Sequence, residues 1–272
     1  VGSSALSANT SGANNTAMGC GALVLNTTGA DNTAIGSGSL DANTTGNYNT
    51  AVGHLSLTAN TTADNNTAIG RSSMCKNTTG TQNTAVGRLA LFNNTTGNNN
   101  IGIGFNALCV NQTGNANVAI GTDSLKNNTG AINVGVGYLS LSSNTSGNCN
   151  VAVGGCAVRC NTTGFNNTGV GACSMFQNTT GHDNTALGRS SLLNNTTGQC
   201  NTGLGRLALF NNTTASNNTA VGFCSLASNT TGGQNTAFGT NALGANTTAS
   251  CNTAFGCGAM KSNTTGSVNT AF

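Results

Sequence analysis

The sequence predicts an all-β protein, a parallel β-solenoid of about sixteen coils with about 17 residues in each coil. Three observations support this prediction. A tetrad N-T-T-G or a close variant recurs along the whole chain, and a second block N-T-A-Φ-G begins six residues after the first Asn of each tetrad, where Φ is Ile, Val, Leu, Met or Phe. The composition, with 39 Gly, no Pro and only 4% aromatic residues, does not fit an ordinary globular core.

The tetrad sets the period of the repeat. Successive tetrads begin seventeen positions apart, except that the one at Asn127 follows Asn111 one position early. The first residue of each tetrad is Asn9, Asn26, Asn43, Asn60, Asn77, Asn94, Asn111, Asn127, Asn144, Asn161, Asn178, Asn195, Asn212, Asn229, Asn246 or Asn263.

A segment of this length is too short for a helical hairpin but long enough for one turn of a solenoid. We expect two short strands in each coil and tight corners at Gly and Asn, which tolerate left-handed backbone. Neighbouring coils would lie about 4.8 Å apart, so sixteen of them predict a rod on the order of 75 Å long. The absence of Pro agrees with a ladder that needs every backbone donor.

The two glycine positions predict two kinds of corner. The Gly after Φ is never replaced, as at Gly36 and Gly53, which indicates a corner that excludes a Cβ atom. The Gly of the tetrad gives way to Ala63, Ala215 and Ala249, which indicates ordinary dihedral angles there.

Successive side chains of a strand point to opposite faces, so the residue types along each strand predict which residues share a face. In T-A-Φ the residue before Φ is always Ala or Gly, and Thr is replaced by an apolar residue at Ile101 and Val118. We therefore expect Thr and Φ to face the coil interior and the Ala/Gly stripe to face outward, against a lateral partner chain. The alternative is a close contact of the small residues inside one flattened coil. A second strand is expected where Ala or Ser precedes Leu or Met, as at Leu40 and Met74.

The invariant Asn and the recurrent Thr predict polar ladders whose side chains bond from coil to coil. Each tetrad is also formally an N-glycosylation sequon, although ladder geometry explains the period without any sugar. The candidate glycosylation sites are Asn26, Asn43, Asn60, Asn77, Asn161, Asn178, Asn229 and Asn263.

The inventory of ionisable residues argues against an enzyme. Asp31 and Asp183 fall nine coils apart, and His54 and His182 are similarly remote, so no acid–base pair or catalytic triad is expected. We interpret His182-Asp183 as a solvated corner. No cofactor or metal is expected, and a net charge of +3 is too weak to indicate a nucleic-acid partner. No stretch is long and apolar enough for a membrane span.

Cysteine offers one candidate bridge. Cys156 and Cys173 lie one period apart, hence on adjacent coils, at a separation compatible with a disulfide. The alternative is that the eleven cysteines act as small neutral surface residues.

A basic and aromatic pattern occurs twice. Arg71, Arg88 and Phe105 follow the corner Gly on three successive coils, and the pattern recurs seven coils later. Stacked arginines beside an aromatic ring are candidates for contact with an anion or a glycan. The alternative is a copied segment whose charges are simply solvated. The second set is Arg189, Arg206 and Phe223.

The repeat predicts a single continuous domain over residues 1–272. Both ends fall within the same motif, so we interpret the chain as a window on a longer fibre or as a subunit that stacks end to end.

The blocks NTAIG (32–36), NVAIG (117–121) and NVAVG (150–154) resemble the repeats in the heads of YadA-like trimeric autotransporter adhesins, and similar repeats occur in phage tail fibres. The resemblance implies a left-handed β-roll, lateral association of three chains and a head that binds host surface components. The coil here is longer than in that family and carries the N-T-T-G insertion.

The expected function is therefore an extracellular homotrimeric fibre, a structural or adhesive shaft on a cell or virus surface. The first alternative is a receptor- or glycan-binding head of an adhesin or tail fibre. A minor alternative is an ice-binding solenoid, which would need flat rows of exposed Thr.

Overall fold

The computed structural model describes residues 2–272. The chain divides into two compact units, residues 1–133 and 134–272. Each unit is a stack of parallel coils that repeat about every 17 residues, and no helix occurs among the described residues. The prediction of an all-β parallel β-solenoid is therefore confirmed.

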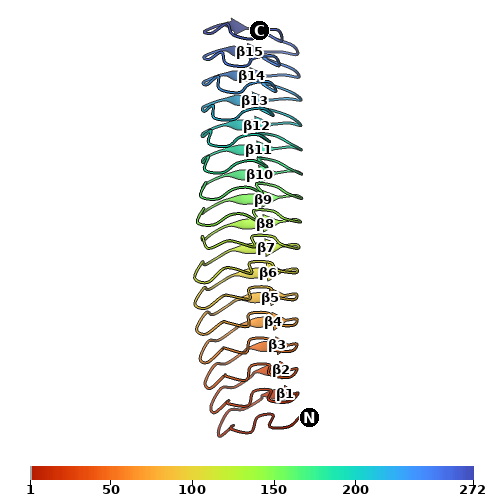
Figure 1. Ribbon diagram of the computed structural model, residues 1–272, viewed down its shortest axis with the longest axis vertical. Helices are drawn as coiled ribbons and strands as arrows, with labels where there is room; N and C mark the ends of the chain where they lie inside the picture. The colour runs from red at the N-terminus through yellow and green to blue at the C-terminus, as the bar shows by residue number, and fades with distance from the viewer. Residues whose placement is uncertain (1) are drawn as a thin grey trace. The chain divides into compact units, whose positions relative to one another are not determined.

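In the first unit each coil contributes one three-residue strand, and each strand pairs with the strand of the next coil (Figure 1). The pairing is parallel and in register, so Thr33 lies opposite Thr50 and Ala34 opposite Ala51. The strands are β1 (Thr16–Met18), β2 (Thr33–Ile35), β3 (Thr50–Val52), β4 (Thr67–Ile69), β5 (Thr84–Val86), β6 (Ile101–Ile103) and β7 (Val118–Ile120).

The second unit repeats this arrangement, with Thr168 opposite Thr185 and Gly169 opposite Ala186. Its strands are β8 (Val134–Val136), β9 (Val151–Val153), β10 (Thr168–Val170), β11 (Thr185–Leu187), β12 (Thr202–Leu204), β13 (Thr219–Val221), β14 (Thr236–Phe238), β15 (Thr253–Phe255) and β16 (Thr270–Ala271).

The expectation of a second strand in each coil is wrong. The segment that carries Leu or Met is a turn, and its apolar residue has left-handed backbone, with φ of 51° at Leu40 and 45° at Met74. The segment is therefore not an extended strand, although its backbone still hydrogen-bonds to the next coil, as from Leu40 to the Ser56 carbonyl oxygen at 3.1 Å. Burial of the side chain offsets the strain of about 1–2 kcal/mol that a residue with a Cβ meets in this region.

The two glycine corners behave as predicted. The Gly after Φ has φ of 133° at Gly36 and Gly53, and a Cβ atom at Gly36 would lie 2.5 Å from the carbonyl oxygen of Gly53. The Gly of the tetrad has no positive φ at Gly29 or Gly46, so Ala63 can occupy the same corner without a left-handed backbone.

The assignment of strand faces in the sequence analysis is also wrong. The middle Ala of β2 to β5 is fully buried, whereas Ile35 and Ile69 are 37% and 40% exposed. The reason is the turn segment, whose Leu or Met fills the interior. A Cβ atom at Gly102 in β6 would lie 3.3 Å from Cγ of Leu91, so only a very small residue fits opposite that leucine. The small stripe thus packs inside the coil, which was the alternative that the sequence left open.

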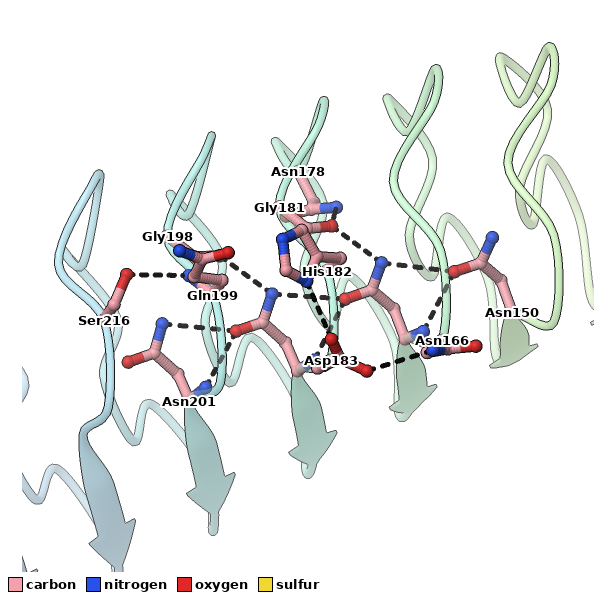
Figure 2. Close-up of polar contacts among 12 residues, drawn as sticks. Asn150, Asn166, Asn178, Gly181, His182, Asp183, Gly198, Gln199, Asn201 and Ser216 are labelled. Carbon is pink, nitrogen blue, oxygen red and sulfur yellow. Dashed lines mark hydrogen bonds and ion pairs between the residues drawn. The ribbon is translucent and has the colours of Figure 1, made fainter.

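Two asparagine ladders run through each interior, as predicted. In the tetrad ladder, Asn43 Nδ2 donates to Asn26 Oδ1 at 2.8 Å and to the Gly46 carbonyl oxygen at 3.0 Å. In the second ladder, which precedes the strands, Asn184 donates from both its backbone nitrogen and Nδ2 to Asn167 Oδ1, each at 3.1 Å. Figure 2 shows part of this second ladder, between Asn150 and Asn201. The ladders satisfy the buried amides within each coil stack.

The short coil breaks the tetrad ladder. Asn127 is exposed, and Asn128 is the buried residue, which donates to the Gly130 carbonyl oxygen at 2.8 Å. The missing residue therefore lies between Asn128 and Gly130, and not before Asn127 as the sequence spacing suggested. Asn111 Oδ1 is buried and has no hydrogen-bond partner as a result.

Candidate functional site

The first candidate surface is the outward face of the strands, which we call the strand face. It consists of the first and third side chains of each strand, a row of Thr or β-branched residues and a row of Φ residues. The Φ row is exposed or half-buried in both units: Ile120 and Leu187 are each 39% exposed, whereas Val86 is half-buried. Each unit therefore carries an apolar row along its sheet, with one Φ side chain per coil.

Side chains of the strand face stack along the coils. The rings of Phe238 and Phe255 lie 4.8 Å apart, centroid to centroid, and are inclined by only 3°. This spacing is that of neighbouring strands, so the ladder imposes its period on the side chains outside as well as inside.

The second candidate surface follows the corner Gly, where the sequence places the two sets of arginine and phenylalanine. We call these the arginine columns. In the first column the guanidinium of Arg88 lies over the ring of Phe105, 5.4 Å from its centroid, and Arg71 occupies the equivalent position one coil earlier. The structure thus brings each predicted set together on adjacent coils.

The second column has the same geometry. Arg206 lies over Phe223 at 5.6 Å from the ring centroid, and Arg189 precedes it by one coil. Phe105 and Phe223 are 40% and 42% exposed, so both rings remain accessible beside the cations.

The structure contains two further cation–π pairs that the sequence did not predict. Lys76 lies 5.2 Å from the ring centroid of Phe92, and Arg159 lies 5.5 Å from that of Phe176. In all four pairs the cation is on the coil before the aromatic residue. A cation followed by an aromatic residue 16 or 17 positions later is therefore the signal that could have found them.

His182 and Asp183 form an exposed pair, 2.7 Å between Nδ1 and Oδ2 (Figure 2). The imidazole stacks on the ring of Phe165. Hydrogen bonds from His182 and Asn166 lower the pKa of Asp183 below its ordinary value. Such an exposed pair contributes little to stability, which agrees with a solvated corner.

All eleven cysteines are free thiols among residues 2–272, including Cys156 and Cys173. These two occupy equivalent left-handed positions on adjacent coils, with φ of 56° at each, but no bond joins them. Burial raises the pKa of the thiols of Cys75, Cys109 and Cys160.

The candidate glycosylation sites lie in the tetrad ladder. Asn263 is partly exposed, and its Nδ2 atom donates to Asn246 Oδ1 and the Gly266 carbonyl oxygen. The other seven are fully buried with the same role, so a glycan on Nδ2 would break the ladder of the folded chain. They are Asn26, Asn43, Asn60, Asn77, Asn161, Asn178 and Asn229.

Residues 2–272 contain no group of three or more His, Cys, Asp or Glu side chains placed to hold a metal ion. Over the same range no helix has the length and apolarity to cross a membrane.

A scan against protein-family models finds no match for this chain. A search of curated proteins finds no similar sequence. The fold by itself defines the class: the chain is a β-solenoid repeat protein.

Proposed function

We propose that this chain forms the shaft of an extracellular fibre, in which three copies associate laterally through the strand face. The observation that carries the proposal is the exposed Φ row, which presents one apolar side chain per coil along each unit. An apolar row of this length on a solvent-exposed surface marks an interaction site. The sequence predicted the lateral contact on the Ala/Gly stripe. Because that stripe is buried, we place the contact on the opposite face of the same strands.

The period of the strand face favours a second copy of the chain as its partner. Side chains recur along the row at the strand spacing of about 4.8 Å, so a partner must carry the same axial repeat to match them all. Another copy of the solenoid has that repeat, and closed cyclic symmetry would bury the row on every copy.

The area available also fits a stable interface. We allow about 60 Å² of exposed apolar surface for each Φ side chain, roughly two-fifths of a residue of this size. The Φ row of a single unit then offers a few hundred Å². Adding the flanking row and the partner's surface brings the buried total to about 1,000 Å², which a specific interface requires.

The number of copies, the left-handed coil, the extracellular or virion-surface location and the adhesive role rest on the resemblance to YadA-like heads. A shaft of this kind needs no reactive groups, because its function is mechanical: within each unit, backbone hydrogen bonds join each coil to the next at the turns as well as at the strands.

Sedimentation of the purified chain tests the proposal. We expect the wild type to sediment as a trimer. A triple variant of the Φ row, Ile69→Asn, Val86→Asn and Ile103→Asn, should sediment as a monomer that keeps its β circular dichroism spectrum. The matched control places three asparagines on the exposed second Thr of the tetrads, as Thr62→Asn, Thr79→Asn and Thr96→Asn, and should remain trimeric. A wild type that is monomeric at micromolar concentration overturns the proposal.

Ice binding remains a second candidate because the strand face carries a regular outward Thr row beside the Φ row, as at Thr33 and Ile35. The bulky Φ residues Phe238 and Phe255 interrupt its flatness and favour a protein partner. Thermal hysteresis measured on the wild type separates the two, since a monomer that inhibits ice growth supports this candidate and a trimer without hysteresis supports the shaft.

A further inference from the structure

The arginine columns concentrate positive charge that no acid neutralises. They contain four of the five arginines of the chain. Within residues 2–272, the ion pairs are Lys126 with Asp123 and His182 with Asp183, and neither involves a column arginine. Each column therefore presents two guanidinium groups on adjacent coils without a carboxylate partner.

Backbone hydrogen bonds hold the two arginine residues of a column on adjacent coils. Residue Leu89 donates its amide to the Arg71 carbonyl oxygen at 3.2 Å, and Asn106 donates to that of Arg88 at 3.2 Å. The second column has equivalent bonds, from Leu207 to Arg189 at 3.2 Å and from Cys224 to Arg206 at 3.1 Å. The two side chains start about one strand spacing apart, so their like charges repel each other where they approach, and a bound anion relieves this repulsion.

Each column continues beyond its arginines in the same order. Along successive coils the first column has Arg71, Arg88, Phe105 and then Thr122 at the position after the corner Gly. The second has Arg189, Arg206, Phe223 and then Thr240, and all eight residues are exposed. The Phe ring adds an apolar surface, and the Thr adds a hydroxyl, to one end of a cationic pair.

The two segments also share R-L-A-L-F-N-N-T-T at 88–96 and 206–214, whereas the Φ residues before the corners differ at all three coils. Ile69, Val86 and Ile103 precede the three corners of the first column, and Leu187, Leu204 and Val221 those of the second. The column keeps its four residue types while the adjacent row changes.

From these observations we propose that each arginine column is a binding site for an acidic polysaccharide, one site in each unit. The two guanidinium groups bind sulfate or carboxylate groups on successive sugars, since arginine recognises both in bidentate fashion. The exposed Phe ring receives the apolar face of a sugar ring, and the Thr hydroxyl bonds a sugar hydroxyl. Nucleic acid is disfavoured because two cations neutralise too few phosphates for stable binding at physiological salt.

Binding of dextran sulfate and polygalacturonate to the full-length chain, at fixed ionic strength, tests the proposal. We expect both acidic polymers to bind, neutral dextran not to bind, and added salt to weaken binding. The double variant Arg88→Gln/Arg206→Gln should lower the affinity on the order of tenfold. The control Lys76→Gln/Arg159→Gln removes the same charge from the other two cation–π pairs and should lower it less than about twofold.

Several results would overturn the proposal: no binding of acidic polymer by the wild type, equal losses in the two double variants, or tighter binding of a single-stranded oligonucleotide. Competition by inorganic sulfate at an equal concentration of charged groups would instead indicate a free-anion site and also overturn it. Circular dichroism confirms that each variant is folded. The triple Φ-row variant (Ile69→Asn, Val86→Asn and Ile103→Asn) should keep its affinity for the polymer. Failure of the polysaccharide site is therefore distinguishable from failure of the proposed trimer.

Discussion

At the scale of single residues, asparagine is the residue on which the interior depends. Asn167 is fully buried, and its Nδ2 atom donates to Asn150 Oδ1 at 3.1 Å and to the Gly181 carbonyl oxygen at 2.8 Å. Its Oδ1 atom accepts two bonds from Asn184. The side chain uses both its donor and its acceptor functions between coils, which no aliphatic residue of similar size can do.

Removing one rung should therefore destabilise the protein strongly. We expect Asn167→Ala to lower the free energy of unfolding by about 3 kcal/mol or more, because it leaves several buried polar groups without partners at about 1–3 kcal/mol each. Urea denaturation followed by circular dichroism measures the change. The control Thr163→Ala alters an exposed side chain of the same coil and should change stability by less than about 0.5 kcal/mol. Equal effects of the two substitutions would contradict the ladder.

The cysteines should differ in reactivity. The pKa of the thiols of Cys75, Cys109 and Cys160 is raised by burial, so a smaller fraction is thiolate at a given pH and alkylation is slower. We expect iodoacetamide to modify these three last, and the pH at which each reaches half its maximal rate to lie above the ordinary pKa of a cysteine thiol. Peptide mass spectrometry over a time course measures this order. The exposed thiols are Cys20, Cys149, Cys200, Cys251 and Cys257. Uniform rates would contradict the burial in the folded chain.

At the scale of the element, one coil combines a three-residue strand with turns that use left-handed backbone at several positions. The corner glycines and the period of the repeat could be predicted, since glycine is invariant at the corner after Φ, where φ is positive, and is replaced by Ala at the tetrad corner, where it is not. The left-handed leucines could not, because leucine is rarely found in that region and the alternation of small and large residues is typical of a strand. Only the depth of the interior, which the Leu40 side chain fills, explains this conformation.

Paired substitutions in β11 test which face is inside. Ala186 is fully buried and Leu187 is 39% exposed. We expect Ala186→Leu to destabilise the fold by about 1–3 kcal/mol through overpacking. Leu187→Ala should lower the thermal stability of the monomer only slightly while weakening self-association. Thermal unfolding together with sedimentation measures both effects. If Leu187→Ala destabilised the fold more than Ala186→Leu, the burial of the Ala/Gly stripe would be contradicted.

At the scale of the whole molecule, regular stacking means that a missing residue in one coil disrupts the hydrogen bonds of an asparagine ladder. The short coil is such a defect, because the missing residue between Asn128 and Gly130 leaves Asn111 Oδ1 buried without a partner. An unpaired buried acceptor costs about 1–3 kcal/mol. The first unit ends at Asn133, so the defect lies close to its end.

Restoring the tetrad should repair the ladder. Inserting a Thr between Thr129 and Gly130 gives N-T-T-G, and we expect it to raise stability by about 1–3 kcal/mol. Hydrogen exchange should then slow over residues 111–133. The matched control inserts a Thr between Thr163 and Gly164, which makes a tetrad one residue too long and should destabilise its coil. No gain from the first insertion would mean that the deletion is accommodated without loss.

The sequence by itself determined the period, the parallel stack of coils, the two kinds of glycine corner and the asparagine ladders. These properties depend on local backbone restrictions and on identical residues meeting one coil apart, so a repeat displays them directly. It also placed Arg88 beside Phe105, because residues one period apart must be neighbours.

Only the tertiary structure decided which strand face is buried, that Leu40 lies in a left-handed turn and that Asn128, not Asn127, enters the ladder. Alternation shows that two faces differ but not which one is inside. That choice depends on how much space the turn segment fills across the coil, and with a leucine there only alanine or glycine fits opposite it.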